Sequence, residues 1–133
     1  MNTISALPPL LLVAIGGGTG AMLRYLVGRW ALAAFGPGFP VGTLAVNLLG
    51  GLAMGLVVGM LARVNEGGEH LRLLLGVGVL GGFTTLSAFS LEMVNMVTRN
   101  EIGLAVAYAT ASVLGSMAAL FIGLWIVRGL GAV

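Results

Sequence analysis

The sequence predicts an all-α integral membrane protein with four transmembrane helices. Hydrophobic residues make up 59% of the 133-residue chain and charged residues 8%, well below the roughly 25% charged residues of soluble domains. A membrane-spanning helix needs ~20 predominantly apolar residues. Four apolar segments are near or above that length, at about residues 10–35, 41–62, 71–97 and 102–127. We therefore expect one transmembrane domain over residues 1–133.

The connections between these segments are short. Gly36 to Pro40 has the Gly and Pro content of a turn, Asn65 to His70 is a polar loop, and Thr98 to Glu101 is a tight hairpin. Four helices joined in this way place both chain ends on one side of the membrane. The first residues lack the basic segment of a signal peptide, so we expect the first apolar segment to be retained.

Arginines are almost equally divided between the two expected sides of the membrane. The side with the chain ends carries Arg63, Arg72 and Arg128, and the other carries Arg29 and Arg99. An excess of basic residues on one side sets the orientation of a membrane protein. A near balance therefore predicts insertion in both directions and an antiparallel homodimer with its twofold axis in the membrane plane. The alternative is one dominant orientation, set by features other than the arginine count.

The third apolar segment has an unusual centre. Its sequence from Gly81 to Ser90 contains two glycines, then four hydroxyl side chains among apolar ones. Paired glycines followed by Thr84 and Thr85 indicate a break in the helix. Irregular backbone at membrane depth is tolerated only where protein buries it or where it lines a polar cavity, and such breaks offer carbonyls and amides to ions. We expect an ion-handling site near the bilayer midplane.

Glycines recur at four-residue spacing in two segments. Gly51, Gly55 and Gly59 form one series, and Gly78 and Gly82 form a second. Small residues at this spacing let helix backbones approach closely. The pattern predicts tight helix packing without identifying the partner helix.

Polar side chains inside the apolar segments default to functional hypotheses. Asn47 is the one strongly polar side chain of the second segment, and Tyr108, Ser112 and Ser116 lie at i, i+4 and i+8 along one face of the fourth. Together they suggest a polar lining. The alternatives are an interhelical hydrogen bond for Asn47 and serines bonded to their own helix. Arg24, deeper in the first segment, either extends its charge to the headgroups or places a fixed charge that attracts anions at a vestibule.

Several function classes are excluded by composition. The chain has no cysteine and no lysine, so disulfides, thiolate metal sites and a basic nucleic-acid-binding cluster are not expected. Its one histidine, His70, lies in a loop, and no Ser/His/Asp arrangement is present, so an enzyme is not expected. Glu92 is the only acidic residue inside an apolar segment, and we interpret it as structural or vestibular. The G-x-G-x-x-A pattern after Gly16 lacks the strand that a dinucleotide site requires.

Three motifs, in order, resemble the CrcB/Fluc fluoride channels across all four segments. They are Gly17-Gly18-Thr19-Gly20-Ala21 with Arg24-Tyr25, Gly42-Thr43-Leu44-Ala45-Val46-Asn47 with Gly50, and Gly81-Gly82-Phe83-Thr84-Thr85-Leu86-Ser87-Ala88-Phe89-Ser90. The resemblance implies an antiparallel homodimer with two fluoride pores in the cell inner membrane. It also implies passive export of fluoride from the cytoplasm, and hence fluoride resistance, with a structural sodium ion at the dimer interface.

The resemblance assigns roles to individual residues. It implies that Asn47 donates to fluoride and that Phe89 turns its positive ring edge toward the anion. Backbone carbonyls of Gly81 and Thr84 would hold the sodium ion, and Arg24 would lie at the vestibule. The remaining expected pore residues carry hydroxyls: Thr43, Thr85, Ser87, Tyr108, Ser112 and Ser116.

Leu86 departs from the family pattern. The family usually reads Thr-Thr-Phe-Ser-Thr-Phe where this chain reads Thr84-Thr85-Leu86-Ser87-Ala88-Phe89. A leucine has no positive ring edge, so we expect slower or less selective conduction. Two rival hypotheses remain: a small dual-topology multidrug transporter, which would need an acidic residue in the first segment, and a non-transporting membrane scaffold.

Overall fold

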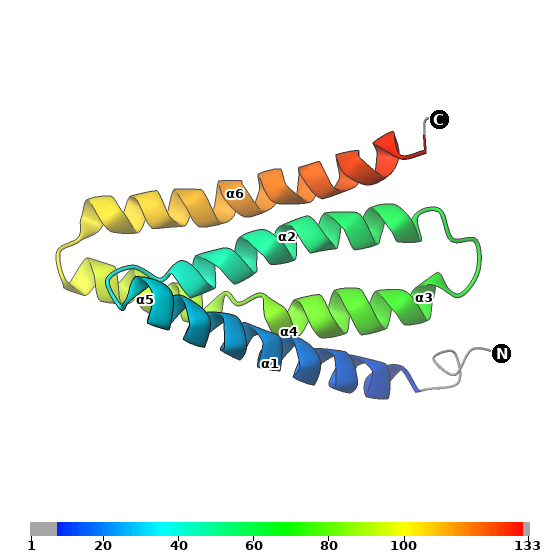
Figure 1. Ribbon diagram of the computed structural model, residues 1–133, viewed down its shortest axis with the longest axis horizontal. Coiled ribbons are helices and arrows are strands. Elements are labelled where there is room, and N and C mark those ends of the chain that lie inside the picture. Colours follow the sequence, from blue (N-terminus) through cyan, green and yellow to red (C-terminus); the bar gives the residue numbers. More distant parts are fainter. Residues whose placement is uncertain (1–7, 132–133) are drawn as a thin grey trace.

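The structure is an all-helical bundle. The computed structural model describes residues 8–131, and in this part four helical segments are long and apolar enough to cross a membrane: Pro9–Phe35, Val41–Leu61, Gly68–Thr98 and Ile102–Gly129. They lie roughly along one direction, with α1 and the third segment on one side of α2 and α6 on the other (Figure 1). The prediction of an all-α chain with four such segments is confirmed. The expectation that the first residues are not a cleaved signal peptide concerns mainly residues 1–7, which lie outside the described part.

Seven elements make up these segments. The third segment is built from four of them in succession, including a nine-residue π-helix, η2. In chain order the elements are α1 (Pro9–Phe35), α2 (Val41–Leu61), α3 (Gly68–Leu71), η2 (Arg72–Leu80), α4 (Gly81–Phe83), α5 (Ser87–Thr98) and α6 (Ile102–Gly129). Apolar periodicity does not distinguish a π-helix from an α-helix, so η2 could not be read from the sequence.

Local sequence accounts for the ends of the helices. Pro9 occupies the first turn of α1, where its missing N–H costs nothing. Gly36 and Gly67 have φ of 75° and 78°, a conformation that glycine adopts without strain. Asn100, with φ of 59°, makes the tight connection between α5 and α6, and asparagine is among the residues that tolerate this region.

The glycines of α2 bring its backbone against α6. A Cβ atom at Gly51 would lie 3.3 Å from the carbonyl carbon of Ser116, and one at Gly55 would overlap the carbonyl oxygen of Leu120. A Cβ at Gly59 would lie 2.9 Å from the side chain of Val127. The tight packing predicted from the spacing is therefore present, and the partner is the fourth long helix of the same chain.

A second set of glycines joins α1 to the third segment. A Cβ at Gly16 would lie 2.9 Å from the Cα of Gly78 in η2, and a Cβ at Gly82 would overlap the backbone of Gly17. A Cβ at Gly20 would lie 2.8 Å from the backbone nitrogen of Phe83. Helix α1 is thus held against the residues that precede the end of α4.

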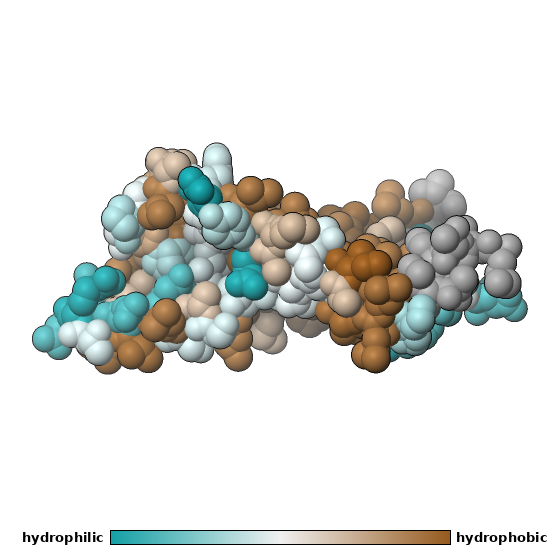
Figure 2. Space-filling view, turned by 90° about the horizontal axis from the view of Figure 1, so that it is seen from below, coloured by the Kyte–Doolittle hydropathy of each residue, from teal (hydrophilic) through white to brown (hydrophobic). Residues whose placement is uncertain are grey.

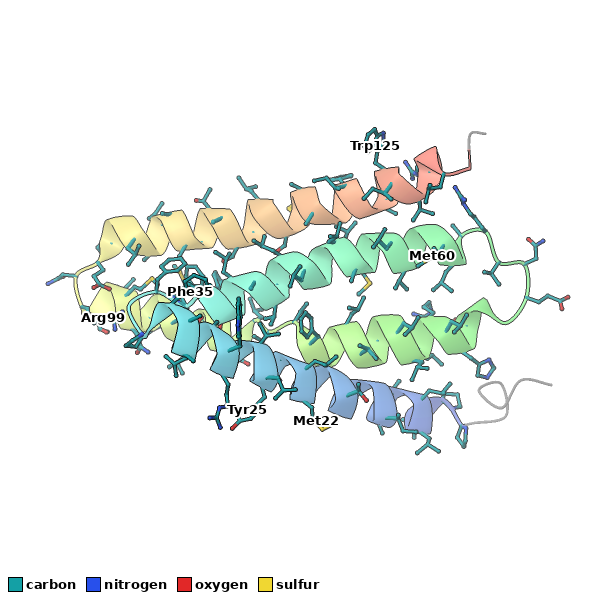
Figure 3. All side chains as sticks on the ribbon, in the orientation of Figure 1. Met22, Tyr25, Phe35, Met60, Arg99 and Trp125 are labelled. Carbon is teal, nitrogen blue, oxygen red and sulfur yellow. The ribbon has the colours of Figure 1, made fainter. Side chains whose placement is uncertain are left out.

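Few side chains are fully buried within one chain. The largest are Tyr108, Leu12, Met96 and Val46, whereas many large apolar side chains are exposed. Figure 2 shows brown patches among white and teal residues on one face. Trp125, 75% exposed, points away from the bundle (Figure 3). An apolar exterior around a small interior is what a bilayer requires, because lipid tails are as apolar as the core.

Gly20→Ala should lower the free energy of unfolding by about 1–3 kcal/mol, the cost of forcing an atom into a packed backbone contact. Gly18→Ala, on the same helix with nothing within 4 Å of its Cβ position, is the matched control and should be neutral or stabilising by up to about 1 kcal/mol. Chemical unfolding of both variants in detergent micelles measures the difference. Equal stability would contradict the close α1 contact.

Candidate functional site

Residues 84–86 separate α4 from α5. Helix α4 ends at Phe83 and α5 begins at Ser87, and Thr84 has extended dihedrals, φ −77° and ψ 156°. The backbone N–H and the hydroxyl of Thr84 both donate to the carbonyl of Leu80, at 3.0 and 2.9 Å. Leu80 thus completes the last turn before the chain leaves the helical conformation. We refer to residues 84–86 below as the connecting segment.

Asn47, from α2, pairs with the connecting segment in both directions. Its Nδ2 donates to the carbonyl of Thr85 at 3.0 Å, and its Oδ1 accepts from the N–H of Thr85 at 2.9 Å. The Asn47 amide therefore pairs with both the N–H and the carbonyl of Thr85, which lies outside the helices and has no helical hydrogen-bond partner. The interhelical hydrogen bond considered for Asn47 is present, and one amide hydrogen is left for another acceptor.

The hydroxyl of Thr85 caps the start of α5. Its Oγ1 accepts from the N–H of Ala88 at 3.2 Å and lies 3.3 Å from the Oγ of Ser87. A side-chain oxygen that accepts from an otherwise unpaired N–H of the first helical turn is a capping interaction. Thr85 and Ser87 therefore also have a structural role at the start of α5.

Among the described residues, the backbone carbonyls of Gly81, Phe83 and Thr84 have no hydrogen-bond donor. Within residues 8–131, no backbone or side-chain group donates a hydrogen bond to the carbonyl oxygen of Gly81 or of Thr84. In a continuous helix the Gly81 carbonyl would accept from the N–H of Thr85, but that N–H is used by Asn47. Gly81 and Thr84 are the two residues predicted to hold a sodium ion through their carbonyls.

A groove of about 400 Å³ lies beside the connecting segment, between α2, α5 and α6. Seven of the sequence-predicted site residues line it: Asn47, Thr84, Thr85, Leu86, Phe89, Ser112 and Ser116. The lining does not include the other five predicted site residues, which are Arg24, Thr43, Gly81, Ser87 and Tyr108. The lining of the groove is mainly apolar with a few polar residues, as in many ligand sites.

The two serines of the groove differ in their hydrogen bonding. Ser116 donates to the carbonyl of Ser112 in its own helix, which is the alternative considered for it. The Oγ of Ser112 is buried, with the residue 5% exposed, and has no partner among the described residues. A buried hydroxyl without a partner is costly, and the Ser112 hydroxyl keeps a donor that no described residue uses. Leu86, 75% exposed, lies at the open edge.

Tyr108 lies deeper and is part of a carboxylate-centred cluster. Its ring is fully buried, 5.1 Å from the ring centroid of Phe89. Glu92 accepts from the Tyr108 hydroxyl at 2.6 Å and from the Thr43 hydroxyl at 2.7 Å. A carboxylate inside a membrane segment needs such partners. The sequence identifies Glu92 as the lone acidic residue of an apolar segment and suggests a structural or vestibular role, but its partners cannot be read from spacing.

One further hollow shares a lining residue with the groove, and a third hollow shares lining residues with the second. Thr85 lines both the groove and a hollow of about 290 Å³ that also contains Arg24 and Arg29. Thr43 lines that hollow and a third, of about 350 Å³, which contains Glu92. Arg24 itself donates from Nε to the carbonyl of Gly82 at 3.0 Å. Two residues whose hydroxyls are expected to line a pore, Thr43 and Thr85, thus each line two neighbouring hollows.

The family model for CrcB-like protein, Camphor Resistance (CrcB), matches residues 11–124. The chain belongs to the CrcB-like family. A relative from Novosphingobium aromaticivorans, "Fluoride-specific ion channel FluC", is 59% identical over 119 residues, 88% of this chain and 94% of the relative. Relatives with the same name from Phenylobacterium zucineum and from Caulobacter sp. strain K31 are each 56% identical over 90% of this chain and 94% of their own.

Membership of this family confirms the resemblance drawn from the three motifs, and with four membrane-length helices it makes the chain a multi-pass membrane protein. No group of three or more His, Cys, Asp or Glu side chains that could hold a metal occurs among the residues described.

Asn47→Leu should destabilise the fold, because it leaves both backbone groups of Thr85 unpaired, at about 1–3 kcal/mol for each group. Asn95→Leu is the matched control, because the Asn95 side chain makes no hydrogen bond within the described chain; its effect should stay within about 0.5 kcal/mol. Unfolding in detergent measures both. Equal effects of the two changes would contradict the Asn47 bridge.

Proposed function

We propose that this chain is a passive, fluoride-selective ion channel that exports fluoride across the cell inner membrane. The observation that carries the proposal is the groove beside residues 84–86, where an amide and a buried, unpaired hydroxyl meet at membrane depth. The relatives are named fluoride-specific ion channels, and that name supports the choice of ion. It also supports a non-enzymatic function.

Fluoride is small and strongly hydrated, so a narrow pore must supply donors in place of water. Asn47 has a spare amide hydrogen, Ser112 has a hydroxyl without a partner, and Phe89 offers a ring edge. None of these carries a full charge. Conduction requires sites that bind well enough to admit an ion and weakly enough to release it, and neutral donors meet both conditions.

The route we propose follows the bordering hollows. Fluoride passes from the hollow with Arg24 and Arg29 past the hydroxyls of Thr43, Thr85 and Ser87 to the groove. The positive charge of Arg24 attracts anions at this vestibule. Ser112 and Ser116 line the α6 wall of the groove, and Tyr108, one turn before Ser112 on the same helix face, continues this polar track.

A second copy of the chain completes each pore in this proposal. The groove is open along the edge where Leu86 is exposed, and one chain alone would leave it facing lipid. A twofold interface uses the same surface of both protomers, so closing one groove closes the other and yields two pores per dimer. The near balance of arginines supports an antiparallel arrangement in which both orientations are equivalent.

A structural sodium ion fits the unpaired backbone carbonyls of Gly81 and Thr84. The oxygens of Gly81 and Thr84 accept no hydrogen bond from the described residues, and neutral oxygen ligands suit a small hard cation. A twofold axis in the membrane plane would double this set. The ion would supply positive charge between two anion paths; Gly81 and Thr84 would hold it through backbone atoms.

The test is fluoride efflux from liposomes that carry the purified protein, with a potassium ionophore to balance charge and chloride measured in parallel. Fast fluoride loss with much slower chloride loss is expected. Folded dimer that passes neither anion would overturn the proposal and favour the scaffold hypothesis. Fluoride loss that requires a proton or drug gradient would favour a transporter.

In the same assay Leu86→Phe should raise the fluoride rate or the preference for fluoride over chloride by roughly two- to tenfold, since aromatic edge contacts contribute about 0.5–1.5 kcal/mol. Leu91→Phe, at an exposed position of α5 away from the groove, is the control and should change neither. If Leu86→Phe also changes neither, Leu86 does not face the anion path.

A further inference from the structure

We infer that Arg24 is a positioning residue: its side chain replaces a missing backbone donor at Gly82 and thereby orients the carbonyls of Gly81 and Thr84 for a cation. This inference rests on the proposed function and goes beyond it. Arg24 then has two roles: its charge attracts anions at the vestibule, and its hydrogen bond holds the Gly82 carbonyl.

The first step is the missing donor. In an α-helix the carbonyl of residue i accepts from the N–H of residue i+4, so the carbonyl of Gly82 would accept from Leu86. Thr84 is extended and α5 begins only at Ser87, so Leu86 is not placed to donate. The Nε of Arg24 donates to the Gly82 carbonyl instead, at 3.0 Å.

The second step is the approach of α1. Gly17 lies against Gly82, and Gly20 lies against the backbone of Val79 and Phe83. Without side chains at these glycines, the α1 backbone is near enough for Arg24 to reach Gly82 while half-buried. The glycine motif of the first helix and its arginine therefore act on the same peptide group.

The third step is the state of the Arg24 charge. The ion pairs in the described chain join Arg72 to Glu69 and Arg99 to Glu101, so no carboxylate there pairs with Arg24. A hydrogen bond from a charged donor to a carbonyl is about twice as strong as one between neutral groups. The Gly82 carbonyl is thus firmly held by α1.

The last step links this bond to the cation ligands. Gly81 and Gly82 are consecutive glycines, the residue type with the most backbone freedom, and their carbonyls would otherwise turn independently. In chain order the carbonyls of Gly82 and Phe83 lie between those of Gly81 and Thr84; Arg24 fixes the one next to Gly81, and Asn47 fixes Thr85, next to Thr84. Each of these two unpaired carbonyls therefore has one neighbouring peptide group held in place, which limits how far it can turn.

The test compares two substitutions of Arg24. In Arg24→Gln, the amide Nε2 stands the same number of bonds from the backbone as the arginine Nε, so the donor is kept and the charge removed. In Arg24→Met both are removed. The readout is the sodium concentration at the midpoint of thermal stabilisation of the purified dimer, with N-methylglucamine as the replacement cation. Fluoride efflux is measured on the same samples.

Arg24→Met should raise the sodium midpoint by roughly tenfold or more, as expected for loss of one hydrogen bond to a charged donor. Arg24→Gln should stay near the wild-type midpoint, although its efflux falls at low ionic strength because the vestibule charge is lost. Arg29→Met is the matched control from the same helix: the Arg29 side chain is exposed and contacts Tyr25 at 3.5 Å, and its midpoint should not move.

A wild-type midpoint in Arg24→Met would overturn the inference, and so would a shift in Arg24→Gln as large as in Arg24→Met. If Arg24→Met does not fold, Arg24→Gln alone decides: a wild-type midpoint supports the inference, and a shifted one overturns it. Wild-type protein that conducts fluoride without any sodium effect overturns the inference and leaves the channel proposal standing. Wild-type protein with the sodium effect but no fluoride efflux overturns the channel proposal instead.

Discussion

The constraint on which this structure depends is that backbone polar groups at membrane depth must have partners. Residues 84–86 lie between two helices and lose the donors and acceptors that a continuous helix would supply. Asn47 from α2 provides both partners for Thr85, and Arg24 from α1 provides the donor for Gly82. Two neighbouring helices thus supply what the third segment lacks, and the groups still unpaired are those available to ions.

Close helix packing makes these contacts possible. Gly17 and Gly20 bring α1 against η2 and α4, and Gly50 leaves room for the methyl group of Thr84 beside α2. Gly55 holds α2 against α6, which places Ser112 on the opposite wall of the groove. The glycines carry no chemistry, but they set the distances at which an arginine, an amide and a hydroxyl can act.

The sequence was informative where local pattern determines the answer. Lengths of apolar segments predicted the four long helices, and three motifs predicted the family. Contacts between distant residues could not be predicted: Asn47 is 38 positions from Thr85 and Arg24 is 58 from Gly82. The pairing of Glu92 with Tyr108 and Thr43 depends equally on how three helices pack. The π-helix at Arg72–Leu80 has no distinct hydropathy pattern.

The most direct measurement of the central claim is residue-resolved amide hydrogen exchange of the protein in lipid nanodiscs. If the connecting segment is held by side chains and borders a polar path, the Thr85 amide exchanges slowly, because Asn47 accepts from it, and the Leu86 amide exchanges fast. In Asn47→Leu, the Thr85 amide should become fast as well. Uniformly slow exchange across residues 84–86, unchanged by Asn47→Leu, would show a continuous lipid-buried helix and contradict the account.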